Sequence, residues 1–191
     1  MSSVFGNWRR ARLARALERY QPDAEHFPHD AHGKLACEVA LAASAEGNYG
    51  VGAVLVDRAG EVLLTAGNRA FVPRFASEGH AEMALVSRLE AERPELPPGE
   101  LTLVVSLEPC PMCYARLKLA GIGRVLYLAP DEGGGMVDRA RHLPPAWTTL
   151  HPWQAFATAE VGPRLRRLAR AIFRHNLTEM RCRLVARSRP A

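Results

Sequence analysis

The sequence predicts an α/β protein: a three-layer α/β/α sandwich built on a mixed sheet of about five strands. Three observations predict this fold. Two strand-like runs are joined by a short turn, and helix-like and strand-like segments then alternate along the chain. The composition of 48% hydrophobic, 24% charged and 7% aromatic residues is typical of a globular protein with a buried core. At 191 residues, one such core accounts for the chain most simply.

The N-terminal part of the chain is predicted to be mainly helical. Residues 9–20 have the pattern of a first helix ending near "YQPD", and residues 20–33, rich in Pro, His and Asp, predict a linker. A second helix is expected from Asp30, as its N-cap, to Gly47. Its apolar face contains Leu35, Val39, Ala42 and Ala43. We therefore expect an extension of helix and linker over residues 1–33, and a main domain over residues 34–191.

Strand and helix signals follow in a regular order. The runs "VGAVLVD" (51–57) and "EVLLTAG" (61–67) are joined by "RAG" and predict a β-hairpin. The segments expected next are a helix from about residue 79 to 92, a buried strand at 101–107, a helix at 110–120 and a strand at 124–129. Gly121 is placed to end the second of these helices.

The C-terminal third of the chain has two different patterns. Residues 131–163 show no clear hydrophobic period; a fifth strand is expected there, at a position that the sequence does not fix. From about residue 163 the main domain ends in a helical segment. Between residues 164 and 175, apolar residues recur along one face of this segment, so the arginines of this stretch fall on the opposite, solvated face. These apolar residues are Leu165, Leu168, Ala169, Ile172 and Phe173.

Arginines are concentrated at the two ends of the chain, whose net charge is +5. Residues 1–19 contain five arginines against Glu18, and residues 164–191 contain nine against Glu179. Arginine-rich ends of this kind could attract RNA or single-stranded DNA. The solvated face of an amphipathic helix is the simpler interpretation.

No apolar run approaches the roughly 20 residues that would cross a bilayer, so no membrane association is expected. The N-terminal arginines follow the few apolar residues there instead of preceding an apolar stretch, unlike a secretory signal. We therefore expect a cytoplasmic protein.

The stretch "SLEPCPMC" carries the most informative pair of residues, Cys110 and Cys113. Pro109 and Pro111 favour a chain that leaves the preceding strand and turns directly into a helix. Both thiols then face the same way at a helix N-terminus, where the exposed N–H groups favour the thiolate form. Two such sulfurs are half of a zinc site. A redox pair and a closed structural zinc, completed by Cys37 or another histidine, are the alternatives.

A third ligand is offered by "SEGHAEMALV", in which His80 begins the other predicted helix. One His and two Cys leave the fourth tetrahedral position of zinc open, which is the mark of a catalytic site. Glu82 is the candidate general base and acid beside it. Residues i and i+2 of a regular helix point about 160° apart, so this pair can converge only at the start of the helix.

His80-Ala81-Glu82 followed by Pro109-Cys110-Pro111-Met112-Cys113 resembles the signature of the cytidine deaminase superfamily, H-x-E then P-C-x-x-C. The match extends in order over roughly residues 34–129, through "VGAVLVD", "AGNRA", "GHAEMALV", "SLEPCPMC" and "GIGRVLY". It is nearest in motif to the branch that holds tRNA adenosine, guanine and cytosine deaminases. The resemblance implies a cytidine deaminase-like fold.

The resemblance also implies residue roles and a reaction. His80, Cys110 and Cys113 would bind one zinc ion, and Glu82 would shuttle protons. Asn68 would contact the base, and the backbone of Ala81 would help to hold its ring. Water activated by the zinc would attack a ring carbon bearing an exocyclic amine, with release of ammonia. Members of the superfamily commonly form dimers or tetramers, which implies a homo-oligomer, most simply a homodimer.

Two departures leave the substrate open. Many members of the branch have Asp-Pro-Thr-Ala before the His-Ala-Glu, where this chain has Ala76-Ser77-Glu78-Gly79. Residues 1–33 and 131–163 follow no pattern of the family. The leading hypothesis is a deaminase of a free nucleobase or nucleoside, of guanine, adenosine or cytosine type. The alternatives are a polynucleotide deaminase of the tRNA adenosine type, and a non-catalytic module in which zinc stabilises a surface for a nucleic acid or another partner.

Other candidate residues have simpler interpretations. Cys37 and Cys182 are predicted to be small buried residues. His26, His29 and His32 lie around Pro28, which prevents their stacking on one helix, so a solvated linker is favoured over a second metal site. Packing explains Trp147, Trp153 and Phe156 at least as well as stacking on a base does.

Overall fold

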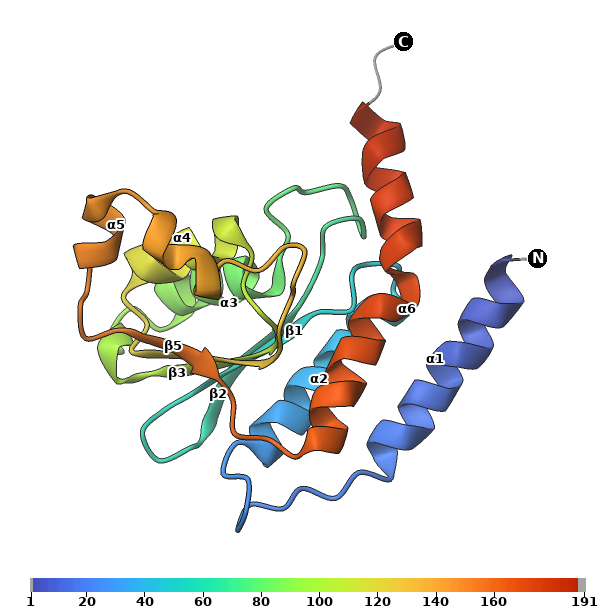
Figure 1. Ribbon diagram of the computed structural model, residues 1–191, viewed down its shortest axis with the longest axis horizontal. Helices are drawn as coiled ribbons and strands as arrows, with labels where there is room; N and C mark the ends of the chain where they lie inside the picture. Colours follow the sequence, from blue (N-terminus) through green and yellow to red (C-terminus); the bar gives the residue numbers. More distant parts are fainter. Residues whose placement is uncertain (1, 189–191) are drawn as a thin grey trace.

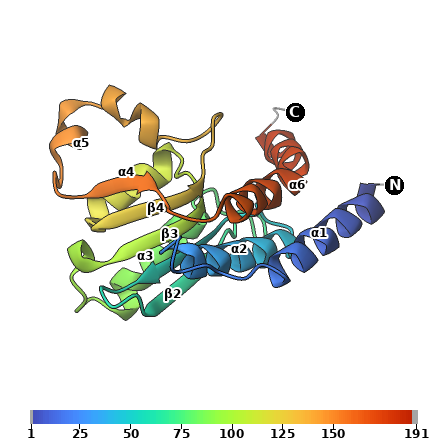
Figure 2. The same ribbon diagram turned by 60° about the horizontal axis from the view of Figure 1, so that its bottom comes forward.

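A mixed five-stranded sheet with the order β2-β1-β3-β4-β5 forms the middle layer of the protein. The computed structural model describes residues 2–188. The strands are β1 (Gly52–Val56), β2 (Val62–Gly67), β3 (Thr102–Leu107), β4 (Arg124–Ala129) and β5 (Ala155–Thr158). This confirms the predicted mixed sheet in an α/β/α sandwich (Figures 1 and 2).

The strand directions decide where the loops meet. β1 lies between β2 and β3 and pairs with both in the antiparallel sense, so β2 and β3 run in the same direction. β4 and β5 then continue parallel to β3. The carboxyl ends of β2 and β3 therefore lie at one edge of the sheet, and the segments that follow both strands begin there.

Helices cover both faces of the sheet. α2 (Asp30–Ala45) and α6 (Pro163–Ser188) pack on one face, and α3 (Ala81–Glu92) and α4 (Pro111–Ala120) pack on the other. α1 (Ser2–Glu18) lies alongside α6 and α2, on the side away from the sheet (Figure 2). The remaining short helices are η1 (Pro98–Glu100), η2 (Val137–His142) and α5 (Pro145–Thr149). Within residues 2–188, no helix is long and apolar enough to cross a bilayer.

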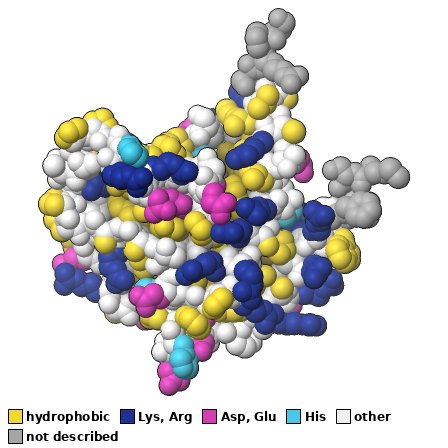
Figure 3. Space-filling model, in the orientation of Figure 1, with side chains coloured by type: hydrophobic (Ala, Val, Ile, Leu, Met, Phe, Trp, Pro, Cys, Tyr) yellow, Lys and Arg dark blue, Asp and Glu magenta, His cyan; other side chains and the backbone are white. Residues whose placement is uncertain are grey.

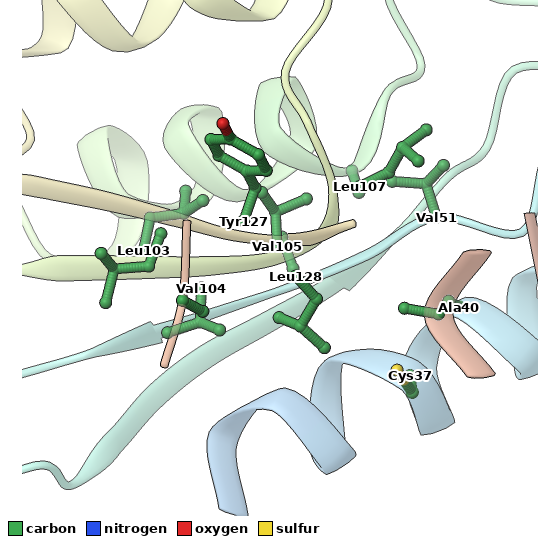
Figure 4. Packing of buried hydrophobic residues seen from close by; sticks show 14 of the residues in the cluster. Cys37, Ala40, Val51, Leu103, Val104, Val105, Leu107, Tyr127 and Leu128 are labelled. Atoms are coloured by element: carbon green, nitrogen blue, oxygen red, sulfur yellow. The ribbon is translucent and has the colours of Figure 1, made fainter. Parts of the chain in front are cut away.

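The core lies between the sheet and its two helical layers (Figure 4). Val105 and Leu128 of the central strands are fully buried, and Cys37 and Ala40 of α2 are buried in the same cluster. β1 is buried along its whole length. A Cβ atom on Gly52 would lie 2.4 Å from the backbone oxygen of Ala36, so only glycine permits this contact between β1 and α2.

Most predicted elements are observed within one or two residues of their expected bounds. The fifth strand, whose position the sequence left open, is β5 at the edge beside β4. α6 is longer than the helical stripe at residues 164–175 and continues to Ser188. The division of the chain at residue 33 stays a prediction; α2 itself begins at Asp30.

Two predictions about single residues are wrong. His29, not Asp30, occupies the N-cap of α2, and it makes no side-chain capping bond. Cys182 is exposed, whereas Cys37 is fully buried as predicted. The inward-facing positions in this part of α6 are Asn176 and Met180, and Cys182 lies off this stripe.

The carboxylate of Asp30 joins three segments that are distant in the chain. It is fully buried and accepts hydrogen bonds from the hydroxyl of Tyr20 at 2.6 Å, the backbone N–H of Asp23 at 3.1 Å and that of Gly162 at 2.8 Å. Burial, followed by the hydrogen bond to Asp30, raises the pKa of Tyr20. These bonds attach the end of α1 and the start of α6 to α2.

Replacing Asp30 with alanine is expected to destabilise the fold by about 3 kcal/mol, because buried donors lose a charged acceptor. Tyr20→Phe removes one donor and its own hydrogen bond, so it should cost less, about 1 to 2 kcal/mol. Urea unfolding followed by circular dichroism measures both free energies. Equal stability of Asp30→Ala and the wild type would contradict this account of how α1, α2 and α6 are joined.

Candidate metal centre and active site

The N-termini of α3 and α4 meet at the edge of the sheet where β2 and β3 end. His80 is the N-cap of α3, with φ −79° and ψ 152°, and Cys110 is the N-cap of α4, with φ −71° and ψ 170°. Both residues are therefore extended and stand outside the helical rotation. The expected divergence of i and i+2 side chains on a regular helix therefore does not apply to His80 and Glu82, because only Glu82 lies within α3.

The predicted ligands lie together. The ligand atoms of His80, Cys110 and Cys113 all lie within 4.8 Å of one another. Nδ1 of His80 is 3.6 Å from Sγ of Cys110 and 3.4 Å from Sγ of Cys113. Tetrahedral zinc, with Zn–S near 2.3 Å and Zn–N near 2.0 Å, places its nitrogen and sulfur ligands about 3.6 Å apart. The three donors therefore fit zinc in both kind and spacing.

The two thiols differ in their ionisation. The hydrogen bond from Cys113, reinforced by His80, lowers the pKa of Cys110 to about 4 against the opposing effect of burial. The same hydrogen bond and burial raise the pKa of Cys113. Burial lowers the pKa of His80, but its interactions with Cys110 outweigh this effect and raise it. Cys110 is thus ionised at neutral pH, in the form that binds metals.

Glu82 lies beside the three candidate ligands. Its side chain is almost completely buried, and burial raises the pKa of its carboxyl group. It accepts a hydrogen bond from the thiol of Cys113. A carboxyl group with a raised pKa next to a metal site is suited to taking up and returning a proton near neutral pH.

A cavity of about 300 Å³ opens directly onto these residues. Asn68, His80, Glu82, Glu108 and Cys110 contribute its polar side chains at the sheet edge. Four aromatic residues also contact it, and they come from three segments outside the zinc motifs. They are Tyr49, Phe71, Phe75 and Phe173. A polar end beside aromatic walls suits a flat heterocyclic ring.

The two residues predicted to bind the base differ in their positions. Asn68 is buried and lines the cavity, with Oδ1 accepting a hydrogen bond from the backbone N–H of Ala70 at 3.0 Å. The amide NH2 of Asn68 is thereby the group left to serve a ligand. Ala81 is fully buried at the first position of α3 and is not part of the cavity wall.

Residues 131–137, which follow no pattern of the family, are tied to the site by Glu108. One oxygen of its buried carboxylate accepts from the backbone N–H of Asp131 at 3.0 Å and the other from Val137 at 2.9 Å. A Cβ atom on Gly135 would collide with the carboxylate of Glu108, so the absence of a side chain at Gly135 allows this close approach. Asp131 consequently lines the cavity.

The second half of α6 forms another wall that the sequence reasoning missed. Leu177, Arg181 and Leu184 line the cavity together with Phe173. The guanidinium of Arg183 lies 4.5 Å from the ring centroid of Phe71, and that of Arg187 lies 4.0 Å from that of Phe75. α6 thereby holds the loop between β2 and α3. The aromatic residues of "AFVPRFASEG" are the feature of the sequence that could have indicated this wall of the cavity.

The same loop is fixed from beneath by buried asparagines. Oδ1 of Asn48 accepts hydrogen bonds from the backbone N–H groups of Phe71 and Val72, at 2.9 and 3.0 Å. The side chain of Asn176 on α6 donates to the backbone oxygen of Asn48 at 2.6 Å. The loop, α6 and the end of α2 are therefore one connected unit around the cavity mouth.

The aromatic and histidine candidates with simpler interpretations lie elsewhere. None of Trp147, Trp153 and Phe156 lines the cavity; Phe156 packs on Tyr114 with ring centroids 4.4 Å apart. His26 pairs with Asp23, whereas His29 accepts from the backbone of Glu160, and Nε2 of His32 lies 2.9 Å from the backbone oxygen of Gly60. The three histidines thus have separate partners.

Comparison with known proteins gives close relatives in one family. The "probable cytosine deaminase" of Schizosaccharomyces pombe is 34% identical over 102 residues, covering 53% of this chain and 60% of that protein. The tRNA-specific adenosine deaminase of Agrobacterium fabrum is 39% identical over 106 residues, covering 55% of this chain and 68% of that protein. The chain thus spans about three fifths to two thirds of the length of these relatives.

Solved structures agree with the sequence relatives. A chain from a study of A-to-I editing by tRNA:A34 deaminases has a TM-score of 0.61 at 31% identity, covering 74% of this chain and 98% of that one. The guanine deaminase from Nitrosomonas europaea, at 22% identity and a TM-score of 0.58, covers 86% of this chain and 92% of that one and shows the shared fold.

The family model for the cytidine and deoxycytidylate deaminase zinc-binding region matches residues 28–129, a segment that contains all three candidate ligands and Glu82. This match covers more than half of the chain and confirms the resemblance seen in its motifs. The chain therefore belongs to the cytidine and deoxycytidylate deaminase family.

Proposed function

We propose that the protein is a zinc-dependent hydrolytic deaminase that removes the exocyclic amino group of a nucleobase or nucleoside. One observation carries the proposal: His80, Cys110 and Cys113 converge beside the buried carboxyl group of Glu82, at the polar end of an aromatic-walled cavity. A closed structural zinc needs neither a cavity nor a general base, so the catalytic alternative is favoured over a binding module.

The site residues have different roles in the proposed reaction. His80, Cys110 and Cys113 would hold a zinc ion, which would supply an activated water. Glu82 takes a proton from the attacking water and passes it to the base. Asn68 offers its NH2 group to an acceptor on the ring. A role for the backbone of Ala81 stays a prediction from the resemblance, because Ala81 does not line the cavity.

The reaction balances without another reagent. Water adds to the ring carbon that carries the amino group, and a C–O bond forms. The C–N bond to that amino group then breaks, and the protons moved by Glu82 leave with the nitrogen as ammonia. The ring carbon becomes a carbonyl. That a homodimer carries out this reaction in the cytoplasm stays a prediction.

The purified protein is expected to contain about one zinc ion per chain, with three protein ligands. Cys113→Ser should lose most of the bound zinc, because a hydroxyl does not replace a thiolate ligand. Cys182→Ser is the matched control, since Cys182 is exposed, is not a candidate ligand and does not line the cavity. Elemental analysis of dialysed protein measures both; full zinc content in Cys113→Ser would refute the ligand assignment.

Glu82→Gln is expected to retain zinc and lose about 10²- to 10⁴-fold in deamination rate, since it removes the proton shuttle. Ammonia release measures the rate with a panel of guanine, adenine, cytosine, their nucleosides and a tRNA. The panel identifies the substrate at the same time. Turnover of any of these substrates by Glu82→Gln at the wild-type rate would contradict the proton-transfer role of Glu82.

A second candidate function is deamination of a base within a polynucleotide. The relative from Agrobacterium fabrum is named a tRNA-specific adenosine deaminase. This function is favoured by Arg181, whose exposed side chain lines the mouth of the cavity. Among residues 2–188, no ion pair occupies its guanidinium. A guanidinium at the entrance of a base-sized cavity is placed to bind a phosphate that flanks the base.

Arg181→Gln therefore tests which substrate is used. If the substrate carries phosphate, kcat/KM for it should fall about tenfold or more, with a smaller change for the free base. Arg58→Gln is the control, because it removes the same charge at the opposite edge of the sheet, where Arg58 pairs with Glu100. Equal losses on free base and on polynucleotide would exclude a phosphate-binding role for Arg181.

A further inference from the structure

A second hollow lies away from the active site, in the groove between α1 and the first half of α6. Its volume is about 630 Å³, and its floor is apolar, formed by Leu13, Ala16, Leu168 and Ala171. The two helices pack against each other along this line (Figures 1 and 2). We name it the α1–α6 groove; its other lining residues are Trp8, Arg9, Arg12, Arg164, Arg167, Arg174 and His175.

The walls of the α1–α6 groove carry positive charge without compensation. Five arginines line it, no carboxylate does, and none of the five forms an ion pair within residues 2–188. Figure 3 shows the Lys and Arg side chains gathered over α1 and the first half of α6 on the face in view. Guanidinium groups that converge in this way repel one another unless an anion lies between them.

Trp8 gives the groove an aromatic surface. It is 57% exposed, which is unusual for a large hydrophobic side chain, and the guanidinium of Arg12 lies 6.0 Å from its ring centroid. An exposed indole beside cations is the combination that proteins use to stack the bases and neutralise the phosphates of single-stranded nucleic acids.

We propose that the α1–α6 groove binds a single strand of RNA, with its arginines on the phosphates and Trp8 stacked on a base. The ligand is a strand and not a membrane surface, because the charges line a concave groove instead of a flat face. The apolar side of α1 is also already used: Leu17 is 2% exposed, in the same core as Leu168 of α6. A helix that inserts into lipid must leave that side free.

The position of the groove relates it to the active site. α6 carries both: Arg167 and Arg174 line the groove, and Arg181 lines the cavity. At about 1.5 Å per residue, Arg174 and Arg181 are about 10 Å apart along the helix axis. A strand held in the groove can therefore cross α6 and present a base to the cavity. Delivery of a base to the cavity rests on the second candidate function. Binding of a strand in the α1–α6 groove does not depend on it.

Binding is measured by fluorescence anisotropy with a labelled uridine oligomer of about 15 nucleotides. Uracil has no exocyclic amino group, so the probe cannot be deaminated, and binding is tested independently of the proposed activity. Arg12→Gln/Arg167→Gln should weaken binding about tenfold or more and lower the slope of log K against log salt by about 1.4. Trp8→Leu should weaken it about tenfold, as the loss of one stacked base predicts.

The matched control is Arg15→Gln/Arg19→Gln, which removes two exposed arginines near the same helix that do not line the groove. Its affinity should stay within about twofold of the wild type. Equal loss in both double variants would overturn the proposal in favour of unspecific attraction to a basic surface. Binding to phosphatidylserine vesicles with none to the oligomer would overturn it in favour of a membrane surface.

Discussion

The direction of β1 is the constraint on which the site depends. Because β1 pairs in the antiparallel sense with both neighbours, β2 and β3 run alike, and the residues after them arrive at one edge of the sheet. His80 and Cys110 then occupy N-cap positions, where an extended backbone aims each side chain back over the sheet edge. If β1 were parallel to one neighbour and antiparallel to the other, β2 and β3 would run in opposite directions, and the two helix starts would lie at opposite ends of the sheet. The sheet topology therefore brings the side chains of His80, Cys110 and Cys113 together without a bound metal.

The same edge is closed by parts of the chain that do not belong to the zinc motifs. Glu108 holds residues 131–137 through two backbone N–H groups, and Asn48 holds the loop after β2 through two others. Both acceptors are buried, so removing either one would leave unpaired N–H groups at the cavity rim. The rim is thus fixed by hydrogen bonds, and the shape of the cavity is determined before a base enters.

Sequence reasoning predicted the parts of the protein that local pattern determines. Apolar, β-rich runs located β1 to β4, and the Pro-Cys-Pro spacing located the start of α4. It failed where tertiary contacts decide the outcome. Asp30 looks like an N-cap from its neighbours, but its carboxylate is used by Tyr20 and Gly162, far away in the chain. β5 lies at the edge of the sheet and has only four residues, three of them exposed, so it gives no period to recognise.

The arginines of α6 are the most instructive miss. The amphipathic pattern over residues 164–175 correctly places Leu165 and Ile172 in the core, but it ends before the second half of the helix. In the structure, Arg183 and Arg187 cover aromatic rings of the loop after β2, and Arg181 reaches the cavity. The region matched by the family model runs from residue 28 to residue 129, so both α1 and α6 lie outside it. The three candidate metal ligands and Glu82 therefore lie in the region that the family model matches, whereas α6, which lines the same cavity, lies outside it.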